Sequence, residues 1–122
     1  MKQKIEQFTA YLDTQIAHCA EQEKQLLADA RKDEAIFAKI RANVYGIFRS
    51  IFGVAVDTRG ENAEAMRAFF LKQAEHIPSS WHISYETAKQ HDDVAKMQIE
   101  TTKLAVVQEI VTTFTEIWGD NT

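Results

Sequence analysis

WHISYETAKQHDDVAKMQIETTKLAVVQEIVTTFTEIW, residues 81–118, contains neither glycine nor proline. A mostly apolar stripe recurs along it at intervals of three, four or seven residues, the spacing that gathers side chains on one side of an α-helix. Viewed down the helix axis, the side chains of this stripe lie within ~60° of one direction. They are Trp81, Tyr85, Ala88, Ala95, Ile99, Thr102, Val106, Ile110, Phe114 and Ile117. Ser79, Ser80 or Ser84 is a suitable N-cap and Gly119 a suitable C-cap. The pattern therefore predicts one long helix over residues 80–118.

Two further amphipathic segments occupy the N-terminal part of the chain. A helix over residues 3–30 is predicted by Ile5, Phe8, Leu12, Ile16, Cys19, Leu26, Leu27 and Ala30. A helix over residues 34–55 is predicted by Ile36, Phe37, Ile40, Val44, Ile47, Phe48, Ile51 and Val54. Asp33 is an acceptable N-cap for the second helix, but neither glycine nor proline separates the two segments. Two helices joined by a tight turn and one continuous rod both fit this pattern.

Turn-forming residues concentrate in DTRGEN at residues 57–62 and PSS at residues 78–80. Asn62 is a suitable cap for a short helix over residues 62–76, which ends before Pro78 because proline disfavours helical backbone at the preceding residue. We therefore expect an all-α fold, with residues 1–122 in a single domain built as an elongated antiparallel bundle of three to four helices. Its long helices of ~45 and ~57 Å exceed what a compact chain of this size accommodates. This length favours a bundle that another chain completes.

Composition and charge exclude several classes of protein. Fourteen basic and eighteen acidic residues give a net charge of −4, without the basic excess that phosphate contacts need, so we expect no nucleic-acid partner. The most apolar segment, Val44–Val56, spans only ~20 Å against ~30 Å of bilayer hydrocarbon, and Arg49 interrupts it, so we expect no membrane partner. Cys19 is the single cysteine, which fits a small buried hydrophobe in a cytoplasmic protein.

The residue types that carry catalysis or bind metals do not form a recognisable constellation. None of the histidines has an acidic residue three or four positions before it, as a helical metal site requires; they are His18, His76, His82 and His91. The sequence also lacks a Gly-x-Ser-x-Gly elbow, a phosphate-binding loop and a dinucleotide fingerprint. We therefore expect no catalytic residue, no metal and no cofactor, and a protein that is not an enzyme.

Two carboxylates interrupt the apolar stripes. Glu23 lies on the first stripe and Asp92 on the last. A buried carboxylate must be paired or protonated, so one hypothesis is a polar pocket that binds a small cation or another polar ligand. The alternative is that each carboxylate reaches water at the edge of its stripe or pairs with a neighbouring base.

Small residues gather on one side of the second segment, where Ala42, Gly46, Arg49, Ser50 and Gly53 share a face. A glycine inside an exposed helix costs about 1 kcal/mol relative to alanine, so two of them indicate a close approach by another group. That group is a neighbouring helix, a second subunit, or an anionic ligand held by Arg49.

These observations favour a non-enzymatic helical bundle that self-associates, as a homodimer, or binds another protein. The wide apolar end near Val111 and Trp118 should be covered either by the chain itself or by a second copy, and this hypothesis expects a partner to bury it. The alternative is a small-ligand-binding or sensory bundle, with its pocket around Glu23 and Asp92 or on the Gly46/Gly53 face.

Overall fold

The computed structural model describes residues 1–119, which form five α-helices and no strand. The helices are α1 (Lys2–Ala28), α2 (Lys32–Arg59), α3 (Ala63–His76), α4 (Ser79–Gln90) and α5 (Val94–Trp118). The expectation of an all-α bundle is confirmed. Residues 120–122, which the expected single domain includes, lie outside the described residues.

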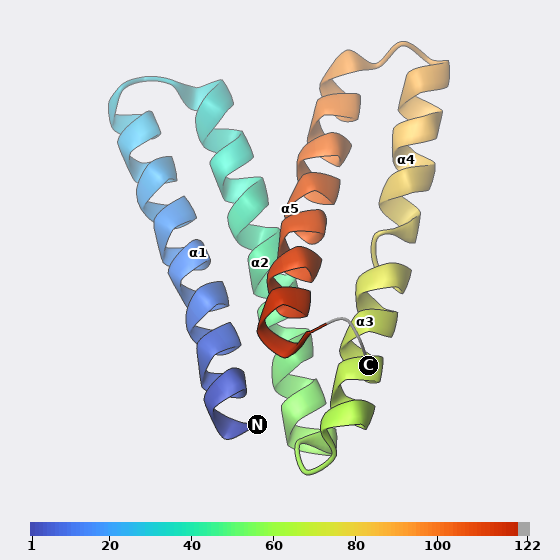
Figure 1. Cartoon of the computed structure of the whole chain (residues 1–122). Helices are drawn as coiled ribbons and strands as arrows, with labels where there is room; N and C mark the ends of the chain where they lie inside the picture. Colours follow the sequence, from blue (N-terminus) through green and yellow to red (C-terminus); the bar gives the residue numbers. More distant parts are fainter. Residues whose placement is uncertain (120–122) are drawn as a thin grey trace.

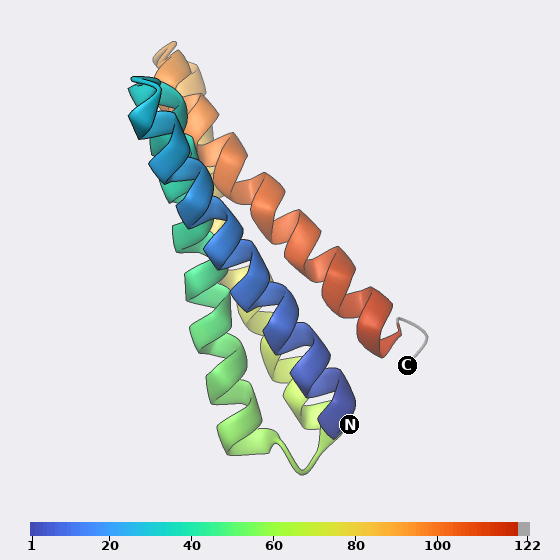
Figure 2. The same cartoon turned by 90° about the vertical axis from the view of Figure 1, so that its left-hand side faces the viewer.

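The helices are arranged as four antiparallel rods. Only Ile77 and Pro78 separate α3 from α4, and the two helices are stacked end to end as one rod (Figure 1). Helix α2 packs against α1, α3 and α5, while α4 packs against α5. The α1–α2 and α4–α5 turns lie at the same end of the molecule, and a view from the side shows that the bundle is elongated (Figure 2). No helix within residues 1–119 is long and apolar enough to cross a membrane.

A tight turn without glycine separates α1 from α2, so the two N-terminal segments are separate helices. Ala30 has φ 58°, its N–H donates to the carbonyl of Leu27, and the N–H of Arg31 donates to the carbonyl of Leu26 at 2.8 Å. These two bonds form a Schellman motif, in which glycine is favoured at the left-handed position. Alanine there gives no sequence signal for a helix end.

The same motif divides residues 80–118, so the prediction of one helix over this range is wrong. Asp92 has φ 55°, and the N–H groups of Asp92 and Asp93 donate to the carbonyls of Lys89 and Ala88. The side chain of Asp93 then caps α5 by accepting from the N–H of Lys96 at 3.1 Å. Aspartate tolerates left-handed backbone and competes with the helix for hydrogen bonds, which is why this acidic pair reverses the chain.

Relief of left-handed strain at Ala30 should stabilise the protein. We expect Ala30→Gly to raise the free energy of unfolding by about 1 kcal/mol, because glycine adopts this backbone without a Cβ penalty. Urea denaturation followed by circular dichroism measures the change. As a matched control, Ala17→Gly on the exposed side of α1 should lower stability by about 1 kcal/mol; a loss of stability at both positions would contradict the role given to Ala30.

The apolar core lies in the half of the bundle away from these two turns. Its largest fully buried side chains come from α1, α2, α3 and α5 and are Phe8, Phe48, Phe52, Phe70, Phe114, Leu12, Met66, Ile110 and Val44. Trp118 is 7% exposed and packs on Phe8, Phe52 and Phe114, and Val111 packs against the same core. The chain itself therefore covers the wide apolar end of α5, and the expectation that a partner buries it is wrong.

Candidate interaction surface on α2

An apolar stripe on α2 faces away from the rest of the bundle. Ile36, Ile47 and Val54 are 52%, 39% and 49% exposed, and Ile40 between them is half-buried. At 100° per residue, these four side chains lie within about 40° of one another around the helix. On the opposite side of α2, Phe52 is buried in the core. Helix α2 is therefore apolar on two sides, of which the chain covers one.

The exposed side of α2 follows a heptad pattern. Ile40, Ile47 and Val54 are seven residues apart, and a second series with the same period lies between them; it consists of Ile36, Asn43 and Ser50. Alternation of the two series at steps of four and three is the a/d spacing of a two-stranded coiled coil, with β-branched residues at the a positions. We call these six residues the α2 seam.

The two glycines of α2 flank this seam. A Cβ atom built at Gly46 meets nothing within 4 Å among the described residues, and one at Gly53 meets Nη1 of Arg49 at 3.7 Å. No other helix of the described chain presses on the backbone at Gly46. The glycine face that the sequence singled out therefore leaves room beside the seam rather than receiving a helix of the same chain.

The structure gives Arg49 a partner within the bundle. Its Nε donates to Oδ1 of Asp13 at 2.9 Å, and this half-exposed ion pair links α2 to α1. Exposed ion pairs contribute ~0–1 kcal/mol. Arg49 therefore serves as a link between helices in this structure.

Glu23 and Asp92, the two carboxylates singled out in the sequence, belong to different hairpins. Glu23 is half-buried on α1, whereas Asp92 is exposed in the turn between α4 and α5. The left-handed backbone of Asp92 gives this residue a role in chain reversal. Among the described residues, no group of three or more His, Cys, Asp or Glu side chains is placed to hold a metal ion.

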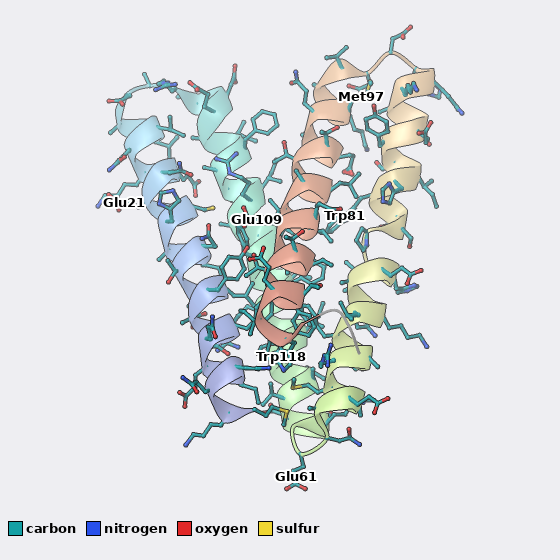
Figure 3. The ribbon with its side chains drawn as sticks, in the orientation of Figure 1. Glu21, Glu61, Trp81, Met97, Glu109 and Trp118 are labelled. Atoms are coloured by element: carbon teal, nitrogen blue, oxygen red, sulfur yellow. The ribbon has the colours of Figure 1, made fainter. Side chains whose placement is uncertain are left out.

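The structure identifies a different carboxylate, Glu109, as a link between helices. Oε2 of Glu109 on α5 accepts hydrogen bonds from the hydroxyls of Tyr11 on α1 and Tyr45 on α2, each at 2.5 Å. Figure 3 shows Glu109 about halfway along the length of the bundle, beside the α1–α2 hairpin, where the residue is exposed. Burial, together with the neighbouring Glu109, raises the pKa of Tyr11 to about 12 and raises the pKa of Tyr45 as well. Both hydroxyls are therefore neutral donors at pH 7.

The tyrosine cluster should make stability depend on alkaline pH. Unfolded tyrosines ionise near pH 10, whereas folded Tyr11 keeps its proton until about pH 12. The stability that protonated Tyr11 contributes to the folded state is therefore complete below pH 10. It is lost as pH rises from about 10 towards 12. We expect urea denaturation at pH 8 to 11 to show a steeper fall in stability for the parent chain than for the double variant Tyr11→Phe, Tyr45→Phe. Parallel curves for the two proteins would contradict this assignment.

A second carboxylate, Glu100, is the one buried charged residue of the described chain, at 3% exposure. Its Oε1 accepts from Nζ of Lys103 at 2.9 Å, and Oε2 has no hydrogen-bond partner. The same Nζ lies 5.4 Å from the ring centre of Trp81 on α4. Figure 3 shows Trp81 between α4 and α5. A sequence signal existed, because Glu100 continues the second apolar side of α5, which includes Leu104 and Val107, by one turn.

Comparisons with protein-family models, with curated proteins and with solved structures find no match to this chain. The physical features of the molecule are therefore the basis for a proposed function.

Proposed function

We propose that this protein is a non-enzymatic helical bundle that self-associates, and that two copies meet through the α2 seam. The observation that carries the proposal is the row of exposed Ile36, Ile47 and Val54 on a helix whose other apolar side is already buried. Burial of such a row removes apolar surface from water at about 25 cal/mol per Å². A symmetric dimer buries the same row twice.

The size of the seam indicates a reversible dimer. Ile36 and Val54 are separated by about 27 Å along the helix axis, and a helix about 10 Å wide then presents roughly 300 Å². Stable interfaces bury about 800 Å² on each partner. The seam by itself is smaller than that, so we expect a weak dimer that dissociates on dilution.

Net charge gives this association a defined dependence on salt. Each chain carries a net charge of −4, so two copies repel one another at long range. Added salt screens that repulsion within about 10 Å at 0.1 M, while apolar burial does not weaken. We expect association to strengthen between 20 mM and 300 mM salt.

A charge placed in the seam should abolish the dimer. We expect Ile47→Lys to leave the fold intact, since Ile47 is 39% exposed, and to hold the protein at the 13.9 kDa of one chain. Light scattering over a wide range of concentration measures the mass, and the parent should rise towards twice this value. The matched control is Ile83→Lys, at a residue 68% exposed on α4, which should dimerise like the parent.

A parent chain that stays monomeric at all concentrations would overturn the proposal, as would an equal loss of association in both variants. Native mass spectrometry of the same samples tests the alternative function, because a retained small molecule would favour a ligand-binding bundle. The proposal includes a cytoplasmic location. Cys19 is a buried free thiol whose pKa burial raises, so the fold does not depend on an oxidising compartment.

A further inference from the structure

Helix α4 buries fewer side chains than any other helix within residues 1–119. Ala88 is the one buried residue among its twelve, and Ile83 is 68% exposed. Trp81, in the first turn of α4, packs against the apolar core. An isolated helix of twelve residues is marginal in water, so the folded state of α4 depends on its contact with a neighbour.

The contact between α4 and α5 is loosely packed. Helix α4 packs against α5 and, among the described residues, makes no comparable contact with another helix; Figure 1 shows it at the edge of the bundle beside α5. Open cavities of about 390, 510 and 290 Å³ border this contact. They are lined by His82 and Leu104, by Tyr85 and Met97, and by Thr87 and Lys96. Few buried apolar contacts give an element low local stability.

Glu100 lies on the side of α5 that faces α4. Leu104 and Val107 follow it by four and seven residues, the spacing of one helix face, and both line a cavity together with His82 of α4. Helix α4 therefore contributes to the cover that leaves Glu100 3% exposed.

Burial of Glu100 has a free-energy cost. Its Oε2 is buried without a hydrogen-bond partner, and the ammonium of Lys103 that bonds Oε1 lies over the ring of Trp81 on α4. A buried polar atom without a partner is unfavourable, whereas the same atom in water is hydrogen-bonded. Separation of α4 from α5 would hydrate this oxygen, and the gain offsets part of the apolar contact that is lost.

Two short links join α4 to the rest of the chain. Ile77 and Pro78 separate it from α3, and proline supplies no N–H to continue the hydrogen bonds of a helix. On the other side, three residues separate α4 from α5, among them Asp92 with its left-handed backbone. Backbone rotation in these links is sufficient to move α4 as one body.

We infer that α4 is a strap that separates from α5 while the apolar core of α1, α2, α3 and α5 stays folded, and that the buried carboxylate of Glu100 favours this opening. The open state places Glu100 in water, together with the side of α5 that includes Leu104 and Val107. This conformational device does not depend on the self-association proposed above.

Hydrogen exchange followed by NMR tests the strap. We expect the amide protons of residues 83–90 to be less protected, by about tenfold or more, than those of residues 48–55 and 107–114, which contribute to the core. Their exchange should depend little on added urea, because the opening exposes little surface. Ala30→Gly, which is expected to stabilise the whole fold, should raise protection in the core about fivefold and leave residues 83–90 within about twofold of the parent.

Two substitutions with opposite expected effects test the part given to Glu100. Glu100→Leu removes the unpaired oxygen and should raise the protection of residues 83–90 about threefold or more. Lys103→Met leaves the buried carboxylate without its partner and should lower that protection about tenfold or more. As a matched control, Glu116→Leu makes the first substitution at an exposed position of α5 and should stay within about twofold of the parent.

Two results would overturn the inference in distinguishable ways. Equal protection and equal urea dependence in α4 and in the core would show that α4 opens only when the whole chain unfolds. Early exchange of α4 with the same protection in Glu100→Leu and Glu116→Leu would overturn the role of the buried carboxylate. Neither result bears on self-association, which light scattering tests separately.

Discussion

Phe8→Ala lowers the free energy of unfolding by about 3–5 kcal/mol, the range for removal of a buried aromatic side chain. Phe8 is fully buried, and its ring centre lies 4.8 to 5.9 Å from four rings of other helices. Those rings come from α2, α3 and α5 and are Phe52, Phe70, Phe114 and Trp118. Because this one side chain joins α1 to three other helices, its removal leaves a cavity that no single helix can close.

The loss of unfolding free energy expected for Phe8→Ala is large relative to the 5–15 kcal/mol that stabilises a typical domain. Urea denaturation followed by circular dichroism and by tryptophan fluorescence measures it, since Trp118 is one of the contacting rings. Gln7→Ala, at the preceding exposed position, should stay within about 0.5 kcal/mol of the parent. A loss below 1 kcal/mol for Phe8→Ala would contradict the central place given to this ring.

Lys103→Met lowers the free energy of unfolding by about 3 kcal/mol, the low end of the range for breaking a buried ion pair. The Glu100 side chain is 4% exposed, and Lys103 supplies the one hydrogen bond that the structure gives to its carboxylate. Removal of the Lys103 ammonium leaves the buried Glu100 carboxylate without a compensating positive charge. The low end applies because the Lys103 side chain keeps 27% exposure, so water partly screens the pair.

The double variant Lys103→Met, Glu100→Leu separates this cause from a loss of packing. Replacement of both charges by apolar groups of similar size removes the uncompensated carboxylate, and stability should return to within about 1 kcal/mol of the parent. Denaturation of the two single variants and the double variant forms the cycle that measures the coupling. A double variant no more stable than Lys103→Met would show that packing against Trp81, rather than charge, is what the lysine provides.

Sequence periodicity predicted the helices well where a cap or breaker has an unambiguous residue type. Asn62 caps α3 by accepting from the N–H of Ala65, close to the predicted start, and the helix stops before Pro78 as expected. The turns at Ala30 and Asp92 were missed or left open for the opposite reason. Their left-handed residues are alanine and aspartate rather than glycine. Alanine gives no signal for a helix end, and the signal from the Asp92–Asp93 pair is weaker than that from a glycine.

The candidate site was less predictable than the fold. Gly46 and Gly53 were recognised as unusual from the sequence alone, but the exposed apolar residues beside them were grouped with buried ones in a single apolar face. Glu100 and Glu109 escaped notice because the role of a carboxylate depends on which side chains other helices bring to it. Tyr11 and Tyr45 are distant in sequence from Glu109, and Trp81 is distant from Lys103, the partner of Glu100.

The sequence by itself determined that this chain is helical, because spacing of three and four residues together with few breakers leaves no other regular structure. Only the tertiary structure decided which apolar faces are covered. Periodicity shows that a side chain is apolar and lies on the same side of its helix as other apolar side chains. Burial of that side chain depends on which other helices pack against it. The chain covers Trp118 with its own aromatic rings and leaves Ile36, Ile47 and Val54 exposed to water. The surface proposed for a partner is therefore the outer side of α2 rather than the end of α5.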